Sequence, residues 1–150
     1  MGRVVSTAPR KTIWAVDDNK ADLDLLEVML EQVDVSLRTF LSSREAIDVL
    51  LATGQADLPD LLLLDVNMPG LDGVEFLRLI RTEPRMADLR IYVVTGAELP
   101  AEHLVLRSLG ALSILRKPQN FGQIEELRRK VRAALDGSMP AAQMLLSRSG

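Results

Sequence analysis

The sequence LLLLDVNMPGLDG, which spans residues 61–73, decides the fold of this chain. Four consecutive leucines predict a short strand that is buried on both faces, as the inner strands of a parallel sheet are. Asp65 ends this apolar run, and a loop rich in turn-forming residues follows it. Leu77 and Ile80 then share one face of a predicted helix, which should end before Pro84. The stretch therefore predicts a strand, a loop and a helix, with a carboxylate where the strand ends.

The same unit recurs on both sides of this stretch. Short apolar or half-apolar runs predict four further strands, at residues 13–16, 35–41, 91–94 and 113–117, and a helical pattern follows each of them.

Local signals mark several of the helix ends. Ser42, with Glu45 three positions later, is typical of a capping box at a helix start. Pro100 suits the first turn of the fourth helix, and Gly110 suits its C-terminal stop. Phe121 is expected to begin the last helix.

Alternating strands and helices predict an α/β fold, in which a doubly wound parallel sheet of five strands is flanked by five helices. The third and fourth strands are continuously apolar and should be central. The second and fifth strands should lie at the edges because they carry polar residues, namely Ser36, Arg38, Ser113 and Arg116. The strand order 2-1-3-4-5 of flavodoxin-like folds satisfies both conditions, and ligands then bind beyond the carboxyl ends of the first and third strands.

The composition indicates one ordinary domain. The chain has 150 residues, of which 47% are hydrophobic, and it carries a formal net charge of −3 and no cysteine. This charge balance does not have the excess of Lys and Arg that is typical of nucleic-acid binding. Without cysteine, neither a disulfide framework nor a thiolate metal site is possible. We find no signal peptide and no apolar run of membrane-spanning length, so we expect a soluble cytoplasmic protein.

The domain boundaries are expected near the ends of the chain. We assign residues 1–11 to an N-terminal tail, 12–135 to the domain and 136–150 to a C-terminal tail, which is too short for an effector module. Residues 141–146 have the composition of one or two further apolar helical turns, and docking, subunit pairing and disorder all remain open for them.

Five chemically active side chains stand where predicted strands end. They are Asp17, Asp18, Asp65, Thr95 and Lys117. Carboxylates packed together repel unless a cation lies among them, and oxygen-only ligands favour Mg²⁺ or a similar hard ion such as Mn²⁺. Asp65 stands alone at the end of the most buried strand and is the best candidate nucleophile, with the Asp17–Asp18 pair as metal ligands.

Several motifs together resemble the receiver domain of bacterial two-component response regulators, of the stand-alone CheY-like type. The resemblance covers about residues 12–135 and rests on Asp17-Asp18, the run 65–73, Thr95-Gly96, Gly110-Ala111 and Lys117-Pro118. It implies that Asp65 is phosphorylated by a phosphohistidine of a sensor histidine kinase or of a phosphotransfer protein. The chain would then be a phosphoacceptor that catalyses only its own phosphotransfer and dephosphorylation, and it would signal or relay phosphate through protein contacts.

The resemblance also implies the remaining roles in the site. Asp18 would bind Mg²⁺ directly, Asp17 would act largely through water, and the backbone carbonyl of Asn67 would be a further ligand. By the same resemblance, Thr95 would move toward the phosphoryl group as the switch. Lys117 would contact that group, and the bond between Lys117 and Pro118 would be cis.

The sequence departs from the family at the output end of the switch. Ile114 occupies the position where many receivers have a rotating Tyr or Phe. We expect helix packing to bury either Leu104 or Val105; if both are exposed, they form a possible partner face with Ile114 and Arg116. The downstream target is not identifiable, and we expect a monomer or a weak homodimer.

Two other functions remain as alternatives. One is a receiver-like interaction module that is not phosphorylated, which Ile114 favours weakly. The other is a Mg²⁺-dependent phosphatase with an aspartate nucleophile. Such enzymes require a second Asp two residues after the nucleophile, and this chain has Asn67 at that position. His103, the single histidine, is interpreted as a surface or boundary residue and not as a phosphodonor.

Overall fold

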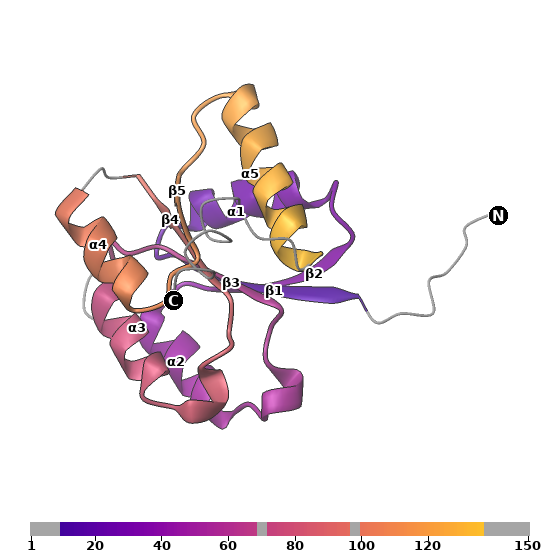
Figure 1. Cartoon of the computed structure of the whole chain (residues 1–150). Helices are drawn as coiled ribbons and strands as arrows, with labels where there is room; N and C mark the ends of the chain where they lie inside the picture. Colours follow the sequence, from indigo (N-terminus) through magenta and orange to yellow (C-terminus); the bar gives the residue numbers. More distant parts are fainter. Residues whose placement is uncertain (1–9, 69–71, 97–99, 137–150) are drawn as a thin grey trace.

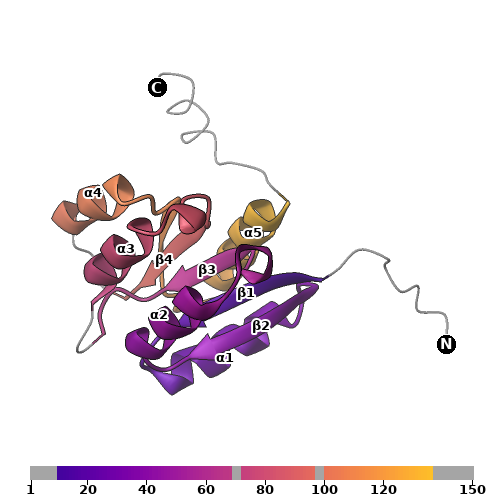
Figure 2. The ribbon, with the colours of Figure 1, turned by 90° about the horizontal axis from the view of Figure 1, so that it is seen from below.

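The computed structural model describes residues 10–68, 72–96 and 100–136. It contains a parallel sheet with the order β2-β1-β3-β4-β5, which confirms the predicted topology. The arrows of β2, β1, β3 and β4 lie side by side and point the same way in Figure 2. The strands are β1 (Lys11–Val16), β2 (Val35–Phe40), β3 (Leu61–Leu64), β4 (Ile91–Thr95) and β5 (Ser113–Arg116).

Helices cover both faces of this sheet. They are α1 (Lys20–Leu30), α2 (Ser43–Ala52), α3 (Gly73–Arg81), α4 (Pro100–Ser108) and α5 (Phe121–Leu135), with short 3₁₀ turns at Gln55–Asp57 and Pro84–Met86. Figure 1 shows α1 and α5 on one side of the sheet and α2, α3 and α4 on the other. This is the three-layer arrangement expected for alternating strands and helices.

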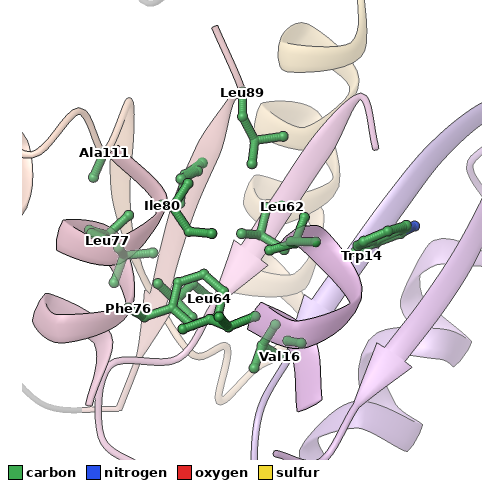
Figure 3. Close-up of a cluster of buried hydrophobic side chains, with 14 of the residues drawn as sticks. Trp14, Val16, Leu62, Leu64, Phe76, Leu77, Ile80, Leu89 and Ala111 are labelled. Atoms are coloured by element: carbon green, nitrogen blue, oxygen red, sulfur yellow. The ribbon is translucent and has the colours of Figure 1, made fainter. Parts of the chain in front are cut away.

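The period-two geometry of the strands divides the core in two. Trp14 of β1, Leu62 of β3 and Phe76 of α3 all belong to the first core, beneath α2, α3 and α4 (Figure 3). Ile13 and Leu61, the preceding residues of the same strands, lie in the second core beneath α1 and α5. Both faces of β3 are therefore covered, which explains why four leucines in succession are tolerated there.

Polar caps begin the helices at the sheet edge. The Ser42 side chain accepts a hydrogen bond from the backbone N–H of Glu45, as predicted. Asn19, Asp72 and Asn120 cap α1, α3 and α5 in the same way. Each cap satisfies a backbone donor that the helix itself leaves unpaired, and so fixes where each helix starts relative to the strand before it.

One arginine ties the opposite end of the first core together. The Arg81 guanidinium donates hydrogen bonds to five backbone carbonyls, those of Met86, Ala87, Leu89, Leu109 and Gly110. Gly110 ends the α4 region with a φ of 92°, a conformation that side chains with a Cβ rarely adopt. The predicted stop at Gly110 is therefore confirmed, and its contact with Arg81 joins α3 to the chain before β5.

The predicted element ends agree with the structure to within one or two residues. β1 begins at Lys11 and so extends two residues before the predicted run, while β2 ends at Phe40 and leaves Leu41 half-exposed. The expectations for residues 1–9 and for the apolar turns at 141–146 lie outside the described residues.

Candidate functional site

Four strand ends meet at the carboxyl edge of the sheet. The backbone N–H of Asp65 donates to the carbonyl of Val16 at 2.9 Å, which sets the end of β3 beside the end of β1. The N–H of Lys117 donates to the carbonyl of Thr95 at 2.8 Å, which joins β5 to β4 in the same way. Residues separated by up to a hundred positions in sequence are thus brought to one edge by parallel pairing alone.

Three carboxylates gather there, as predicted. Oxygen atoms of Asp17, Asp18 and Asp65 lie within 4.8 Å of one another. Asp17 and Asp65 are buried, whereas Asp18 is exposed. Such a group repels itself in a poorly hydrated place, so a cation at this position would stabilise it.

Each buried carboxylate is oriented by its own loop. Asp17 Oδ1 accepts a hydrogen bond from the N–H of Asn19 at 3.0 Å, and Asp65 Oδ1 accepts one from the N–H of Asn67 at 3.1 Å. Asp side chains commonly accept a hydrogen bond from the backbone N–H two residues later in the chain. This hydrogen bond directs one oxygen of each residue into the loop and the other toward the shared centre.

Lys117 lies in this centre. Its Nζ is 2.9 Å from Asp17 Oδ2, 3.2 Å from Asp65 Oδ2 and 2.7 Å from Asp22 Oδ2. The predicted meeting of Lys117 with the aspartates is therefore present, and Asp22 joins them as a partner that the motifs did not include.

Burial and charge shift the acid–base behaviour of this group. Burial is the main cause that raises the pKa of Asp65, and the charge of Asp17 adds to it, while the Asn67 N–H and Lys117 act in the opposite direction. Burial would lower the pKa of Lys117, but hydrogen bonds to Asp22 and Asp17 and the charge of Asp65 outweigh it and raise that pKa. Lys117 is therefore an ammonium ion at neutral pH.

Thr95 ends β4 close to this group. It is buried, and its Oγ1 lies 3.5 Å from the side-chain nitrogen of Asn67, at the long limit of a hydrogen bond. Asn67 thus contacts Asp65 through its backbone and Thr95 through its side chain, and it lies between the two.

A model of the response regulator receiver domain matches residues 13–131. The chain belongs to this family. The match contains all five side chains predicted at the strand ends. Receiver domains are phosphoacceptor modules of two-component signalling, and they interact with histidine kinases or phosphotransfer proteins.

Named relatives agree with this assignment. The chain is 35% identical over 141 residues to response regulator MprA of Mycolicibacterium vanbaalenii, covering 90% of this chain and 57% of MprA. It is 32% identical over 106 residues to response regulator PleD of Caulobacter vibrioides, covering 71% of this chain and 22% of PleD. The chain thus spans about a fifth of one curated relative and little more than half of the other.

Solved receiver structures have the same fold. The phosphorylated cyanobacterial phytochrome response regulator RcpA superposes with a TM-score of 0.74 at 28% identity, covering 83% of this chain and 93% of RcpA. The Mn²⁺-bound form of response regulator Rcp1 gives a TM-score of 0.71 at 26% identity, covering 82% and 92% of the two chains.

The donor set of this receiver domain fits a hard divalent cation. Its ligand atoms are carboxylate oxygens, which Mg²⁺ and Mn²⁺ prefer. Two of the three carboxylates are buried, and burial together with the charge of Asp17 raises the pKa of Asp65, so a cation would favour its charged form. Asp17, Asp18 and Asp65 would hold the ion, and the backbone carbonyl of Asn67 stays a predicted further ligand.

The cis peptide bond expected before Pro118 is not present. No cis bond occurs in the described residues, so the Lys117–Pro118 bond is trans. The trans form is the more stable for most bonds before proline, and the prediction of cis rested on the resemblance alone. Lys117 nevertheless reaches its carboxylate partners.

The expectation that packing buries Leu104 or Val105 is wrong. Leu104 is 75% exposed and Val105 is 37% exposed, because α4 buries Leu106 instead. Ile114 is half-buried and packs against the first core, and Arg116 is exposed.

Asp22 is the residue of the site that sequence reasoning missed. A signal for it exists, because Asn19 and Asp22 have the spacing of a capping box. An acidic residue at the third helical position lies back toward the helix start, and here the helix start is at the site.

None of the helices in the described part of the receiver domain combines the length and the apolar character that a membrane span requires.

Proposed function

We propose that Asp65 accepts a phosphoryl group from a phosphohistidine on a sensor histidine kinase or a phosphotransfer protein, in a reaction that requires Mg²⁺. One observation carries this proposal. The Asp65 side chain is only 4% exposed. One of its oxygens accepts a hydrogen bond from the Asn67 N–H, and the other lies 3.2 Å from the Lys117 ammonium nitrogen. A buried carboxylate oriented in this way is pre-positioned as a nucleophile.

The transfer itself needs positioning and charge neutralisation more than covalent catalysis. An Asp65 oxygen forms the new P–O bond while the P–N bond of the donor breaks and the donor imidazole leaves. Lys117 neutralises negative charge beside the acceptor, and the Asn67 N–H holds the carboxylate in one orientation. These tasks are performed by residues already in contact.

The metal ligands in this proposal are Asp17, Asp18, Asp65 and the backbone carbonyl of Asn67. A bound Mg²⁺ or Mn²⁺ ion would neutralise charge on the phosphoryl oxygens. The oxygen-only donor set supports this, as does the Mn²⁺-bound form of the similar regulator Rcp1.

Thr95 and the surface of α4 would carry the signal onward. The Thr95 hydroxyl would move to a phosphoryl oxygen, and the face formed by Leu104, Val105, Ile114 and Arg116 would contact a protein partner. The exposure of two apolar side chains on α4 supports this choice. Because phosphohistidine donors are made from ATP, we further propose that the transfer takes place in the cytoplasm.

Intact mass spectrometry tests the acceptor. The protein is incubated with phosphoramidate and Mg²⁺, and we expect one added phosphoryl group, which is absent with excess chelator and absent in Asp65→Asn. Asp72→Asn is the matched control, because Asp72 caps α3 and does not belong to the group of clustered carboxylates. An unmodified wild-type protein, or a group that persists in Asp65→Asn, would favour the non-phosphorylated interaction module.

The partner face is tested separately. Proteins captured from a lysate with and without the phosphoryl mimic beryllium trifluoride are compared for wild type, Leu104→Ser and Leu79→Ser. Leu79 is also an exposed leucine, on α3, with 44% of its surface exposed. Loss of mimic-dependent capture in Leu104→Ser alone supports the face, whereas equal capture by both variants contradicts it.

A further inference from the structure

Lys117 has a carboxylate partner that the receiver motifs do not include. Its Nζ lies 2.7 Å from Asp22 Oδ2, which is shorter than its contacts with Asp17 and Asp65. Asp22 is also not one of the three carboxylates whose oxygens cluster as the candidate metal group. Its contact in the site is with the ammonium group.

The start of α1 places Asp22 there. Asn19 caps the helix by accepting a hydrogen bond from the N–H of Asp22 at 3.1 Å, so Asp22 is the third helical residue. A carboxylate in the first turn is favoured by the helix dipole. Asp24, two residues later, instead pairs with Lys20 at 2.9 Å and does not reach Lys117.

Three carboxylates surround the Lys117 ammonium group. An ammonium group has three N–H donors and no acceptor. Asp17, Asp22 and Asp65 each lie within ion-pair distance of it. A phosphoryl oxygen on Asp65 would therefore compete with these carboxylates for the ammonium group.

Asp22 is the partner that is released at least cost. Its side chain is 37% exposed, compared with 10% for Asp17 and 4% for Asp65, so its carboxylate regains water most easily. A metal ion held by Asp17 and Asp65 would also share the other two contacts, which leaves Asp22 as the partner not shared with the metal.

We propose that Asp22 is a reversible counter-ion that holds Lys117 in the unphosphorylated domain and competes with the phosphoryl group for it. This inference rests on the proposed function of Asp65 and assigns Asp22 a positioning role. In the unphosphorylated state Asp22 holds the ammonium group near the acceptor. After phosphorylation the ammonium turns to the phosphoryl oxygen, and the Asp22 carboxylate returns to water.

Binding of beryllium trifluoride with Mg²⁺, measured by calorimetry, tests this competition. Asp22→Asn removes the competing charge with little change of shape. We expect the variant to bind the phosphoryl mimic about threefold to tenfold more tightly than wild type, the range for one partly exposed charge-assisted contact. A purely structural role of Asp22 predicts the opposite, because loss of a structural contact weakens binding.

Two further variants separate charge from other effects. Asp22→Glu restores the carboxylate and should return the affinity to within about twofold of wild type, as an exposed ion pair allows. Asp24→Asn removes the same charge from the same helix, away from Lys117, and should leave the affinity unchanged. Equal or weaker binding by Asp22→Asn, or equally tight binding by Asp24→Asn or Asp22→Glu, would overturn the proposal.

The wild-type titration distinguishes the two levels of inference. If wild type does not bind the mimic with Mg²⁺, the proposed phosphoacceptor function fails and the role of Asp22 fails with it. If wild type binds and Asp22→Asn binds no more tightly, the acceptor function stands and only the counter-ion role is wrong.

Discussion

The backbone N–H of Lys117 donates a hydrogen bond to the carbonyl of Thr95 at 2.8 Å. The predicted phosphoryl-binding lysine and the predicted switch residue are therefore joined through their main chains at the end of the β4–β5 ladder. Their backbones cannot separate without breaking this pairing. A response at Thr95 is thus expected to involve its side chain and the chain that follows it.

Replacing Thr95 by Ala should separate phosphorylation from its consequences. The acceptor and Lys117 remain in place, so the mass gain with phosphoramidate and Mg²⁺ should persist. The hydroxyl that would bind the phosphoryl group is lost, so NMR shifts of α4 amides on addition of beryllium trifluoride should shrink to less than about half.

Thr95→Ser keeps the hydroxyl and is the control for this experiment. It should retain most of the α4 response. Full α4 shifts in Thr95→Ala would show that the hydroxyl is not the link between the acceptor and α4.

Replacing Lys117 by Gln should destabilise the domain and make it more dependent on Mg²⁺. Asp17 and Asp65 would lose their shared counter-charge while staying buried, which costs about 1–3 kcal/mol of unfolding free energy. Mg²⁺ should raise the midpoint of thermal unfolding more in Lys117→Gln than in wild type. The same increase in both proteins would mean that Lys117 and the metal do not compensate the same charges.

Asp18 allows the metal site to be tested without disturbing the core. It is exposed and belongs to the carboxylate group, so Asp18→Asn should weaken Mg²⁺ binding by about tenfold or more, as loss of one charged ligand implies. The fold should be retained. Titration calorimetry measures this change, and Asp24→Asn, on the nearby helix α1, is the control that should bind as wild type does. Unchanged affinity in Asp18→Asn would remove Asp18 from the ligand set.

The fold could be predicted from the sequence because the patterns that mark strands, helices and sheet edges depend on local chemistry. The four leucines at 61–64 favoured an inner strand, and the polar residues of β2 and β5 favoured edge positions, which the structure confirms. The site could then be predicted from the fold, because parallel strands bring the residues at their carboxyl ends to the same edge of the sheet.

The predictions that failed or were missed depend on exact side-chain direction. Leu104 and Val105 are both exposed because the helical phase of α4 buries Leu106, a rotation that apolar spacing did not settle. Asp22 reaches Lys117 because α1 begins at residue 20, which places Asp22 in the first helical turn. The start of a helix is uncertain by about one or two residues when it is predicted from sequence, and such a shift would change the direction of this side chain.

Gly110 provides a test of the contact with Arg81. In Gly110→Ala the new Cβ would lie 2.9 Å from Arg81 Nε, and the φ of 92° would be strained. We expect a loss of about 1–3 kcal/mol in unfolding free energy from the backbone conformation and the displaced guanidinium. Gly54→Ala is the control, because a Cβ there meets nothing within 4 Å, and it should change stability by less than about 0.5 kcal/mol. Equal effects at both glycines would argue against a specific role for the Arg81 contact.

The single tyrosine of the chain makes its alkaline behaviour directly observable. Tyr92 lies in β4 and is 2% exposed, and burial raises the pKa of its phenol above the usual 10.0, while Arg90 opposes this. A pKa raised in the folded state means that the neutral phenol favours folding. This contribution is complete below pH 10.0 and is lost as the pH rises through the folded pKa.

Tyrosinate absorbance should therefore appear only above pH 10.0 in the folded protein, together with loss of circular dichroism, whereas in urea the phenol should ionise near its usual pKa. Tyr92→Phe has no proton to lose, so its stability should fall less steeply in this alkaline range than that of wild type. If tyrosinate forms near pH 10.0 while the fold is intact, water reaches Tyr92 in solution, and the packing of β4 in the second core is looser than the structure indicates.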